Sequence, residues 1–327
     1  MAMQYVRAED TTTAVDLVAS NPSAAYLAGG TTEVDLILKD AVVTPEVLVD
    51  VTRLPLRGMR EECDSLVVGA LTTMEELAAH PAIIERAPLI REALLAGAST
   101  QLRNMATIGG NLLQRTRCRY FRDPMVGACN KRAPGSGCAA YVGEARMHAI
   151  LGASEHCIAL HASDLCVPLV SLDARVRLQG PRGARTVPLR DFYLLPGDTP
   201  DKETVLEHGE LITHVVIPLL PAGARSGYLK VRDRASYEFA LASAAAVVQL
   251  ADERISQARV ALGGVGTMPW RAPEAEAVLV GSRADEPTFR AAADAAVVDP
   301  LVVPGTAFKV ELVKRTLVRL LQDLTEG

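Results

Sequence analysis

The sequence lacks the features that mark nucleic-acid-binding, membrane-spanning and exported proteins. Its net charge is -5 and its pI is about 5.8, whereas phosphate recognition needs a basic surface, so nucleic acid is excluded as the main partner. No apolar run is long enough to span a bilayer, and the N-terminal residues contain no apolar core of a signal peptide. We expect a chain without membrane insertion and without its own signal, periplasmic if a signal-bearing partner exports it and otherwise cytoplasmic.

The six cysteines lack the pattern of a disulfide-rich secreted domain, which is short, whereas this chain has 327 residues and is 49% hydrophobic. They also lack the C-x2-4-C spacing that is usual in structural zinc sites. Four of them fall within residues 118–157 with the spacing C-x10-C-x8-C-x18-C. The other two, Cys63 and Cys166, we interpret as small packing residues.

Strand-like and helix-like segments alternate along most of the chain. Residues 46–52 and 64–70 have the apolar character of strands, and residues 72–83 predict a helix capped by Thr73, which precedes Glu76 by the capping-box spacing. Residues 228–266 predict strand, helix, strand and strand, and two helical stretches follow. This pattern favours an α/β or α+β fold.

Two glycine pairs occur in "AGGTTEVDL" (28–36) and "ATIGGNLLQ" (106–114). A Gly-Gly pair removes two Cβ atoms, so neighbouring backbone amides can turn toward one anion, and adjacent Thr hydroxyls add donors. Both pairs fit a diphosphate site, although either alone can be an ordinary tight turn. Neither is a G-x-G-x-x-G or a Walker motif.

With these motifs in place, the sequence resembles the FAD-binding subunits and domains of the molybdenum hydroxylases. The resemblance rests on six blocks in the family's order: "LAGGTT" (27–32), "RNMATIGGNL" (103–112), "SDLCVPLVSLDARV" (163–176), "GELITHVVIP" (209–218), "YLKVRDRASYEFALASAAAVV" (228–248) and "ALGGVGTMPWRAPEAEAVLVG" (261–281). The fold class that it implies is α+β. An FAD-binding domain of two α/β subdomains, of the vanillyl-alcohol-oxidase/CO-dehydrogenase flavoprotein type, would span residues 1–222, and a small C-terminal α+β domain residues 223–327.

The resemblance also implies which residues bind FAD. The diphosphate would be wrapped by Leu27, Ala28, Gly29, Gly30, Thr31, Thr32 and Glu33. A second phosphate and flavin-side loop would contain Thr107, Gly109, Gly110 and Asn111. Asp164 would face the ribose or adenine, and Lys230 would lie near the flavin, where a cation favours the reduced form. The family commonly has Asp where this chain has Thr32.

Residues 115–160 form an insert between two family blocks and contain the four clustered cysteines. Such a segment, with four thiols and little apolar content, has the composition of a loop held by metal. Zinc is one alternative, but the long sequence separations between the cysteines suit a larger group that is bound from several sides, such as an iron–sulfur cluster. Three histidines, His148, His156 and His161, are further candidate ligands that we interpret as surface or loop residues.

Positive charge gathers in the same region. Residues 103–146 contain eight Lys or Arg against two acidic residues, a balance of +6. Positive surroundings stabilise an anionic cluster. The charge also exceeds what one cluster needs, so Arg119, Arg122, Lys131 and Arg132 are predicted to dock an acidic face of a partner subunit.

Four further stretches, "NLLQRTRC", "CNKRAPGSGC", "RMHAILGASEHCIA" and "KVRDRASYEFAL", narrow the resemblance to the FAD subunits of periplasmic aldehyde oxidoreductases, which carry a 4Fe-4S cluster. This implies Cys118, Cys129, Cys138 and Cys157 as cluster ligands. The chain would transfer electrons between a molybdopterin-binding large subunit with a 2Fe-2S small subunit and an external acceptor. Consistent with that, we find no nucleophile–base pair for aldehyde oxidation in this chain.

Two rival functions stay open at this point. One is a self-sufficient flavin oxidase of the related fold, which would turn over aldehyde or alcohol alone. The other is a zinc-stapled scaffold subunit that has lost flavin, which metal analysis and a visible spectrum would reveal.

Overall fold

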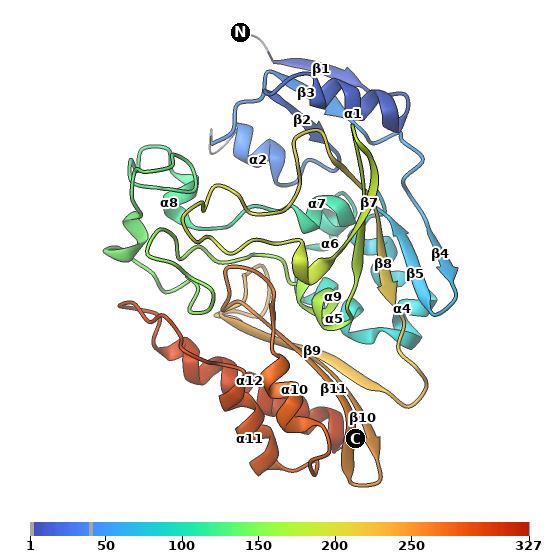
Figure 1. Ribbon diagram of the computed structural model, residues 1–327, viewed down its shortest axis with the longest axis vertical. Helices are drawn as coiled ribbons and strands as arrows, with labels where there is room; N and C mark the ends of the chain where they lie inside the picture. Colours follow the sequence, from blue (N-terminus) through green and yellow to red (C-terminus); the bar gives the residue numbers. More distant parts are fainter. Residues whose placement is uncertain (1–2, 39–41, 327) are drawn as a thin grey trace.

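In the computed structural model, which describes residues 3–38 and 42–326, the strands form three sheets that follow each other along the chain (Figure 1). The first is a small parallel sheet of order β1-β3-β2. Its elements are β1 (Gln4–Arg7), α1 (Thr11–Ala19), β2 (Ala24–Leu27), α2 (Glu33–Leu38) and β3 (Val47–Asp50). Parallel strands need crossover connections, and α1 and α2 lie in them.

The second sheet is antiparallel, with the order β4-β5-β8-β6-β7. Its strands are β4 (Met59–Glu62), β5 (Ser65–Gly69), β6 (Arg175–Gly180), β7 (Gly183–Pro188) and β8 (Leu211–Pro218). The helices between β5 and β6 are α3 (Met74–Ala79), α4 (Pro81–Arg86), α5 (Pro88–Ala96), α6 (Thr100–Arg103), α7 (Ile108–Leu112), α8 (Arg119–Arg122) and α9 (Cys166–Ser171), with the 3-10 helix η1 (Ala139–Tyr141). A second 3-10 helix, η2 (Leu189–Asp191), follows β7. One apolar core joins this sheet to α3, α5, α7 and α9.

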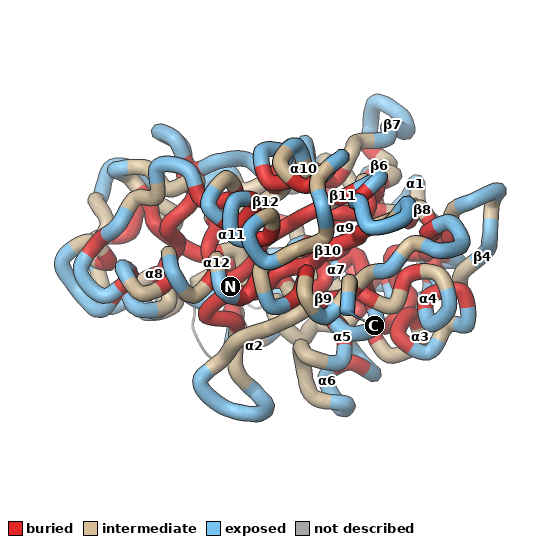
Figure 2. Tube along the Cα trace, turned by 90° about the horizontal axis from the view of Figure 1, so that it is seen from below, coloured by how far each residue is buried: buried red, intermediate tan, exposed pale blue. Residues whose placement is uncertain are grey.

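The third sheet, of order β12-β11-β10-β9, begins the C-terminal domain. Its elements are β9 (Arg225–Val231), β10 (Ala242–Ala251), β11 (Arg254–Gly263), β12 (Trp270–Arg271), α10 (Pro273–Leu279), α11 (Glu286–Ala295) and α12 (Phe308–Thr325). A second core lies between this sheet and the three helices. Figure 2 shows β10, β11 and α9 as a buried band through the middle of the molecule.

The helix predicted between the strands of residues 228–266 is wrong, because the alanine-rich run forms the central strand β10. Its alternate residues belong to two cores: Ala245 and Val247 face α5 and α9, whereas Ala244 and Ala246 face the C-terminal helices. Alanine has the highest helix propensity, but a strand packed on both faces needs small side chains, and burial decides the outcome. The final helical region also holds three helices rather than two.

Local signals are confirmed in the second subdomain. Thr73 and Glu76 form the predicted capping box of α3, and Pro81 both follows the end of α3 and opens α4. Cys166 is buried as expected, but the packing role of Cys63 is wrong: Cys63 is exposed in the turn between β4 and β5, with φ of 52°.

The cysteine insert projects from one side of the fold, drawn green in Figure 1. It packs on both domains through small apolar contacts. Phe121 and Cys129 lie in one cluster with Leu36 of α2, and Ala140 and Ile158 lie in another with Val303, just before α12. The insert therefore connects the first subdomain to the C-terminal domain.

Candidate cofactor pocket and cysteine cluster

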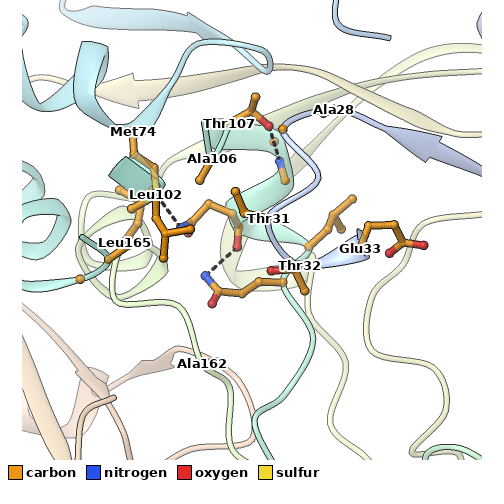
Figure 3. A pocket seen from close by; sticks show the side chains of 18 of the residues that line it. Ala28, Thr31, Thr32, Glu33, Met74, Leu102, Ala106, Thr107, Ala162 and Leu165 are labelled. Atoms are coloured by element: carbon orange, nitrogen blue, oxygen red, sulfur yellow. Dashed lines mark hydrogen bonds between the residues drawn. The ribbon is translucent and has the colours of Figure 1, made fainter. Parts of the chain in front are cut away.

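A cavity of about 560 Å³ lies where the first two sheets and the third sheet meet. Its volume is typical of cofactor pockets, which range over about 300 to 1,000 Å³. Of the residues predicted to bind FAD, only Leu27 does not line it; Leu27 ends β2 just before the first glycine loop. In Figure 3, Met74, Leu102 and Leu165 lie on one side and Thr31, Thr32 and Glu33 on the other, so the cavity has an apolar and a polar part.

The first glycine loop offers unused hydrogen-bond donors to the polar part. Within the described residues, the amides of Gly29, Gly30, Thr31 and Thr32 donate to no protein acceptor. Gly30 adopts φ of +70°, which favours glycine and turns the chain into α2. Consecutive unpaired amides and threonine hydroxyls at a cavity wall form a cradle that fits an anion such as a diphosphate.

The amides of the second glycine loop, unlike those of the first, have acceptors within the protein. The amide of Gly109 donates to Ala70 O at 2.8 Å, that of Gly110 to Thr107 Oγ1 at 3.2 Å, and that of Asn111 to Thr107 O at 2.8 Å. The role of this loop in binding the cofactor stays a prediction. Gly109 permits close packing, since a Cβ there would meet Ala70 Cβ at 2.9 Å. Thr107 and Asn111 still line the cavity.

Asp164 and Lys230 are in direct contact at the cavity wall. Lys230 Nζ lies 2.8 Å from Asp164 Oδ2 and 3.0 Å from Ala96 O, and Tyr228 donates to Asp164 Oδ1 at 2.6 Å. Burial raises the pKa of Asp164, and the charge and hydrogen bonds of Lys230 and Tyr228 oppose this. The two side chains therefore lie side by side at one place on the cavity wall.

Several lining residues were missed by the sequence reasoning. Arg115 borders the polar part, where burial raises the pKa of Glu33 and the charge of Arg115 lowers it. Tyr237 and Phe239 line the cavity from the loop after Lys230, and Tyr237 has φ of 56°. Arg115 follows the predicted site residue Asn111 by a few positions, and this proximity in the sequence could have identified it as a lining residue. The contribution of the loop depends on how the domains pack.

The four clustered thiols come together from separate parts of the insert. Cys129 and Cys138 face each other as partners of an antiparallel bridge. Burial raises the pKa of the Cys118 thiol to about 12, and the nearby thiols of Cys129 and Cys157 raise it too. Burial also raises the pKa of Cys157, with Lys131 opposing it and Cys138 and Cys129 adding to it. All six cysteines are free thiols.

Most of the basic side chains assigned to partner docking form ion pairs or hydrogen bonds with other residues of this chain. Lys131 is 9% exposed, and its Nζ lies 2.8 Å from Glu203 Oε1. Arg132 donates to the carbonyl oxygens of Tyr120 and Phe121, both at 2.8 Å. Arg122 is 12% exposed and lies 3.0 Å from Asp35. The docking prediction is therefore wrong for these three, and only Arg119 is exposed.

The three histidines also differ from one another. His148 lies in a loop, as one of the two predicted alternatives has it, but it is buried and places Nε2 3.2 Å from Cys118 Sγ. His156 is partly exposed, 3.4 Å from Asp198. His161 packs edge-on against Tyr193, with ring centroids 4.7 Å apart. Across residues 3–38 and 42–326, no three His, Cys, Asp or Glu side chains form a site for a single metal ion, and no helix has the length and apolarity to cross a bilayer.

The cysteine cluster and the cavity are neighbours. Arg117 lines the cavity and stacks on Phe239, with Cζ 5.0 Å from the ring centroid, and the next residue is Cys118. A smaller cavity of about 130 Å³ is bordered by both Cys118 and Asp164. Groups held at the two places would thus be separated by few side chains.

Two protein families match successive parts of the chain. Residues 1–220 match the FAD binding domain in molybdopterin dehydrogenase, and residues 227–324 match the CO dehydrogenase flavoprotein C-terminal domain. The chain is 47% identical over 305 residues to the aldehyde oxidoreductase FAD-binding subunit of Escherichia coli, covering 92% of each. It is 31% identical over 264 residues to the carbon monoxide dehydrogenase medium chain of Afipia carboxidovorans, covering 80% of this chain and 74% of that one.

Solved structures show the same architecture. Reconstituted CO dehydrogenase from Oligotropha carboxidovorans matches with a TM-score of 0.78 and 28% identity, covering 100% of this chain and 98% of that one. Quinoline 2-oxidoreductase from Pseudomonas putida matches with a TM-score of 0.76 and 25% identity. The predicted fold class, a two-part FAD-binding domain followed by a C-terminal α+β domain, is confirmed.

Proposed function

Because this chain belongs to the FAD-binding subunits of the molybdenum hydroxylases, we propose that it is the electron-transfer subunit of an aldehyde oxidoreductase and binds one FAD and one 4Fe-4S cluster. A molybdopterin-binding subunit and a 2Fe-2S subunit would oxidise the aldehyde and deliver electrons, and an external acceptor would take them up.

The cavity fits FAD in both of its parts. The unpaired amides of Gly29 to Thr32, with their hydroxyls, would hold the diphosphate, and Met74, Leu102 and Leu165 would contact the flavin ring. FAD supplies the two-electron chemistry when it is bound. Asp164 precedes Leu165 at the apolar part, so the Asp164–Lys230 pair would face the ring rather than the adenine. There the ammonium is a fixed positive charge beside the ring.

The cluster proposal rests on the convergence of four thiols next to that cavity. Cys118, Cys129, Cys138 and Cys157 would be the ligands, and a cluster supplies one-electron transfer when it is present. Four thiolates around one zinc ion lie only about 3.8 Å apart, given Zn–S bonds of about 2.3 Å, whereas a four-iron cluster holds its thiolates more widely. Burial raises the pKa of the Cys118 and Cys157 thiols, and metal binding would deprotonate them.

The test is metal and flavin analysis of the purified chain. We expect about four iron per chain, no stoichiometric zinc, and one FAD. Replacing Cys129 or Cys138 by Ser should remove the iron and leave FAD bound, whereas Cys63→Ser, in an exposed turn, should change neither.

Each rival has its own signature in the same preparation. One zinc per chain and no iron would overturn the cluster and favour the scaffold. Aldehyde turnover by the isolated chain would favour a self-sufficient oxidase.

A further inference from the structure

Lys309, at the start of α12, is a buried ammonium group without a counterion. Its residue is 0% exposed, and its one side-chain hydrogen bond goes from Nζ to Gly264 O at 2.7 Å. It makes no ion pair with any residue that the structure describes. Burial lowers the pKa of Lys309 to about 7, and the charge of Arg146 lowers it too. A buried charge in this state costs several kcal/mol in general, so an unpaired one calls for an explanation.

The surroundings of Lys309 lead to the cysteine cluster. Gly264, its acceptor, borders the small cavity that Cys118 also borders. His148, which is buried, contacts Cys118 Sγ at 3.2 Å. Lys309 is thus linked through Gly264 to the small cavity that the first thiol borders.

The other charges in this neighbourhood do not neutralise the ammonium. Arg146 stacks on Phe308 and pairs with Asp233 at 2.6 Å, and Arg119 is exposed. Asp233 is already paired with Arg146, and Glu144 is exposed and accepts from the Arg146 amide. No described carboxylate therefore pairs with the ammonium, and four thiolates around iron would supply the missing negative charge.

We infer that Lys309 is the buried countercharge of the 4Fe-4S cluster, held by Gly264 beside the small cavity that Cys118 borders, so that it sets the cluster's reduction potential from the C-terminal domain. This rests on the proposed function. Reduction adds negative charge to the cluster, and a fixed cation in a low-dielectric site favours that step. Lys309 is a positioning residue in this scheme, because it touches neither the cluster nor its ligands.

The test is a redox titration of the cluster in the full-length chain, followed by absorbance or electron paramagnetic resonance. Lys309→Gln keeps a donor for Gly264 O and loses the charge, and Lys309→Met loses both. Each should disfavour reduction at least tenfold, which equals about 59 mV for a one-electron couple. Lys309→Arg should keep the wild-type potential. Lys314→Met, on the same helix but paired with Asp294 and 25% exposed, is the matched control.

A second measurement covers variants that lose the cluster. In iron-free protein prepared by chelation, Lys309→Met should be at least as stable to urea as wild type, because it removes an uncompensated buried charge. In iron-loaded protein the same change should destabilise. An unchanged potential at full iron content, or equal destabilisation with and without iron, would assign Lys309 a purely structural role and overturn the inference alone. Absence of iron from the wild type would overturn both it and the proposed cluster.

Discussion

The Cα of Gly29 lies against the carbonyl group of Met105, so closely that a Cβ on Gly29 would stand 2.0 Å from the Met105 oxygen and 2.9 Å from its carbon. Met105 precedes the second glycine loop by one turn. The two loops, which are far apart in the sequence, are therefore held backbone to backbone across the cavity wall. Neither backbone can yield as a flexible side chain would.

We expect Gly29→Ala to force the two loops apart and to empty the flavin site. Gly30→Val should do the same for a different reason, because φ of +70° strains a β-branched residue. FAD per chain, measured from the visible spectrum after gel filtration, is the readout. Gly127→Ala is the control, since a Cβ there meets nothing within 4 Å. A full flavin complement in Gly29→Ala would contradict the role of the first loop.

Removing one partner of the Asp164–Lys230 pair is predicted to destabilise the protein strongly, whereas replacing both by apolar residues is predicted to destabilise it less. Both side chains are largely buried, at 11% and 3% exposure. Lys230→Met or Asp164→Leu leaves one charged group unpaired and should lower the free energy of unfolding by about 3 to 5 kcal/mol. The double variant Asp164→Leu/Lys230→Met should lose less than the sum of the two single changes.

Urea unfolding of the four proteins checks this coupling, with the exposed pair of Arg290 and Glu286 as the control. Arg290→Ala should cost at most about 1 kcal/mol, because exposed ion pairs contribute little. Additive losses at Asp164 and Lys230 would show that the pair is not coupled.

Lys131 is predicted to hold the cysteine insert rather than a partner. It pairs with Glu203, donates to Pro200 O at 2.8 Å and lies near Cys157. Lys131→Glu should place like charges side by side, loosen the insert and remove most of the iron. Arg119→Glu, at an exposed position, should retain the iron. Iron content of the two variants decides: full iron in Lys131→Glu would restore the docking interpretation.

Asp50, at the end of β3, is predicted to contribute pH-dependent stability. Burial favours its protonated form, but hydrogen bonds from Thr52, Tyr5 and Arg7 outweigh this and hold the pKa of Asp50 well below its usual range. A depressed folded-state pKa stabilises the protein above the unfolded value of about 3.9, and the contribution is lost as the pH falls through the folded value.

At pH 7, Asp50→Asn should therefore cost about 1.5 to 3 kcal/mol, the usual range for hydrogen bonds to a charged group. The difference from wild type should shrink steadily below about pH 4. Urea midpoints across this pH range are the measurement, and Asp64→Asn, at a side chain that is 93% exposed, is the control. A difference that stays constant with pH would refute the assignment.

The sequence by itself determined the features that short stretches encode. The capping box of Thr73 and Glu76, the glycine pairs and the spacing of the cysteines depend on neighbours a few residues away, where local sterics and hydrogen bonding operate. The family blocks then predicted the fold class, and every predicted FAD-binding residue except Leu27 lines the cavity.

Only the tertiary structure decided what those residues touch. Asp164 and Lys230 are 66 positions apart, and their contact exists because β9 packs beside α5, which in turn contacts α9. The same holds for Lys131 and Glu203, for the amides of the second glycine loop, and for the alanine-rich strand β10 between two cores. Propensity and spacing carry short-range preferences of a fraction of a kcal/mol per residue, and burial between distant elements outweighs them.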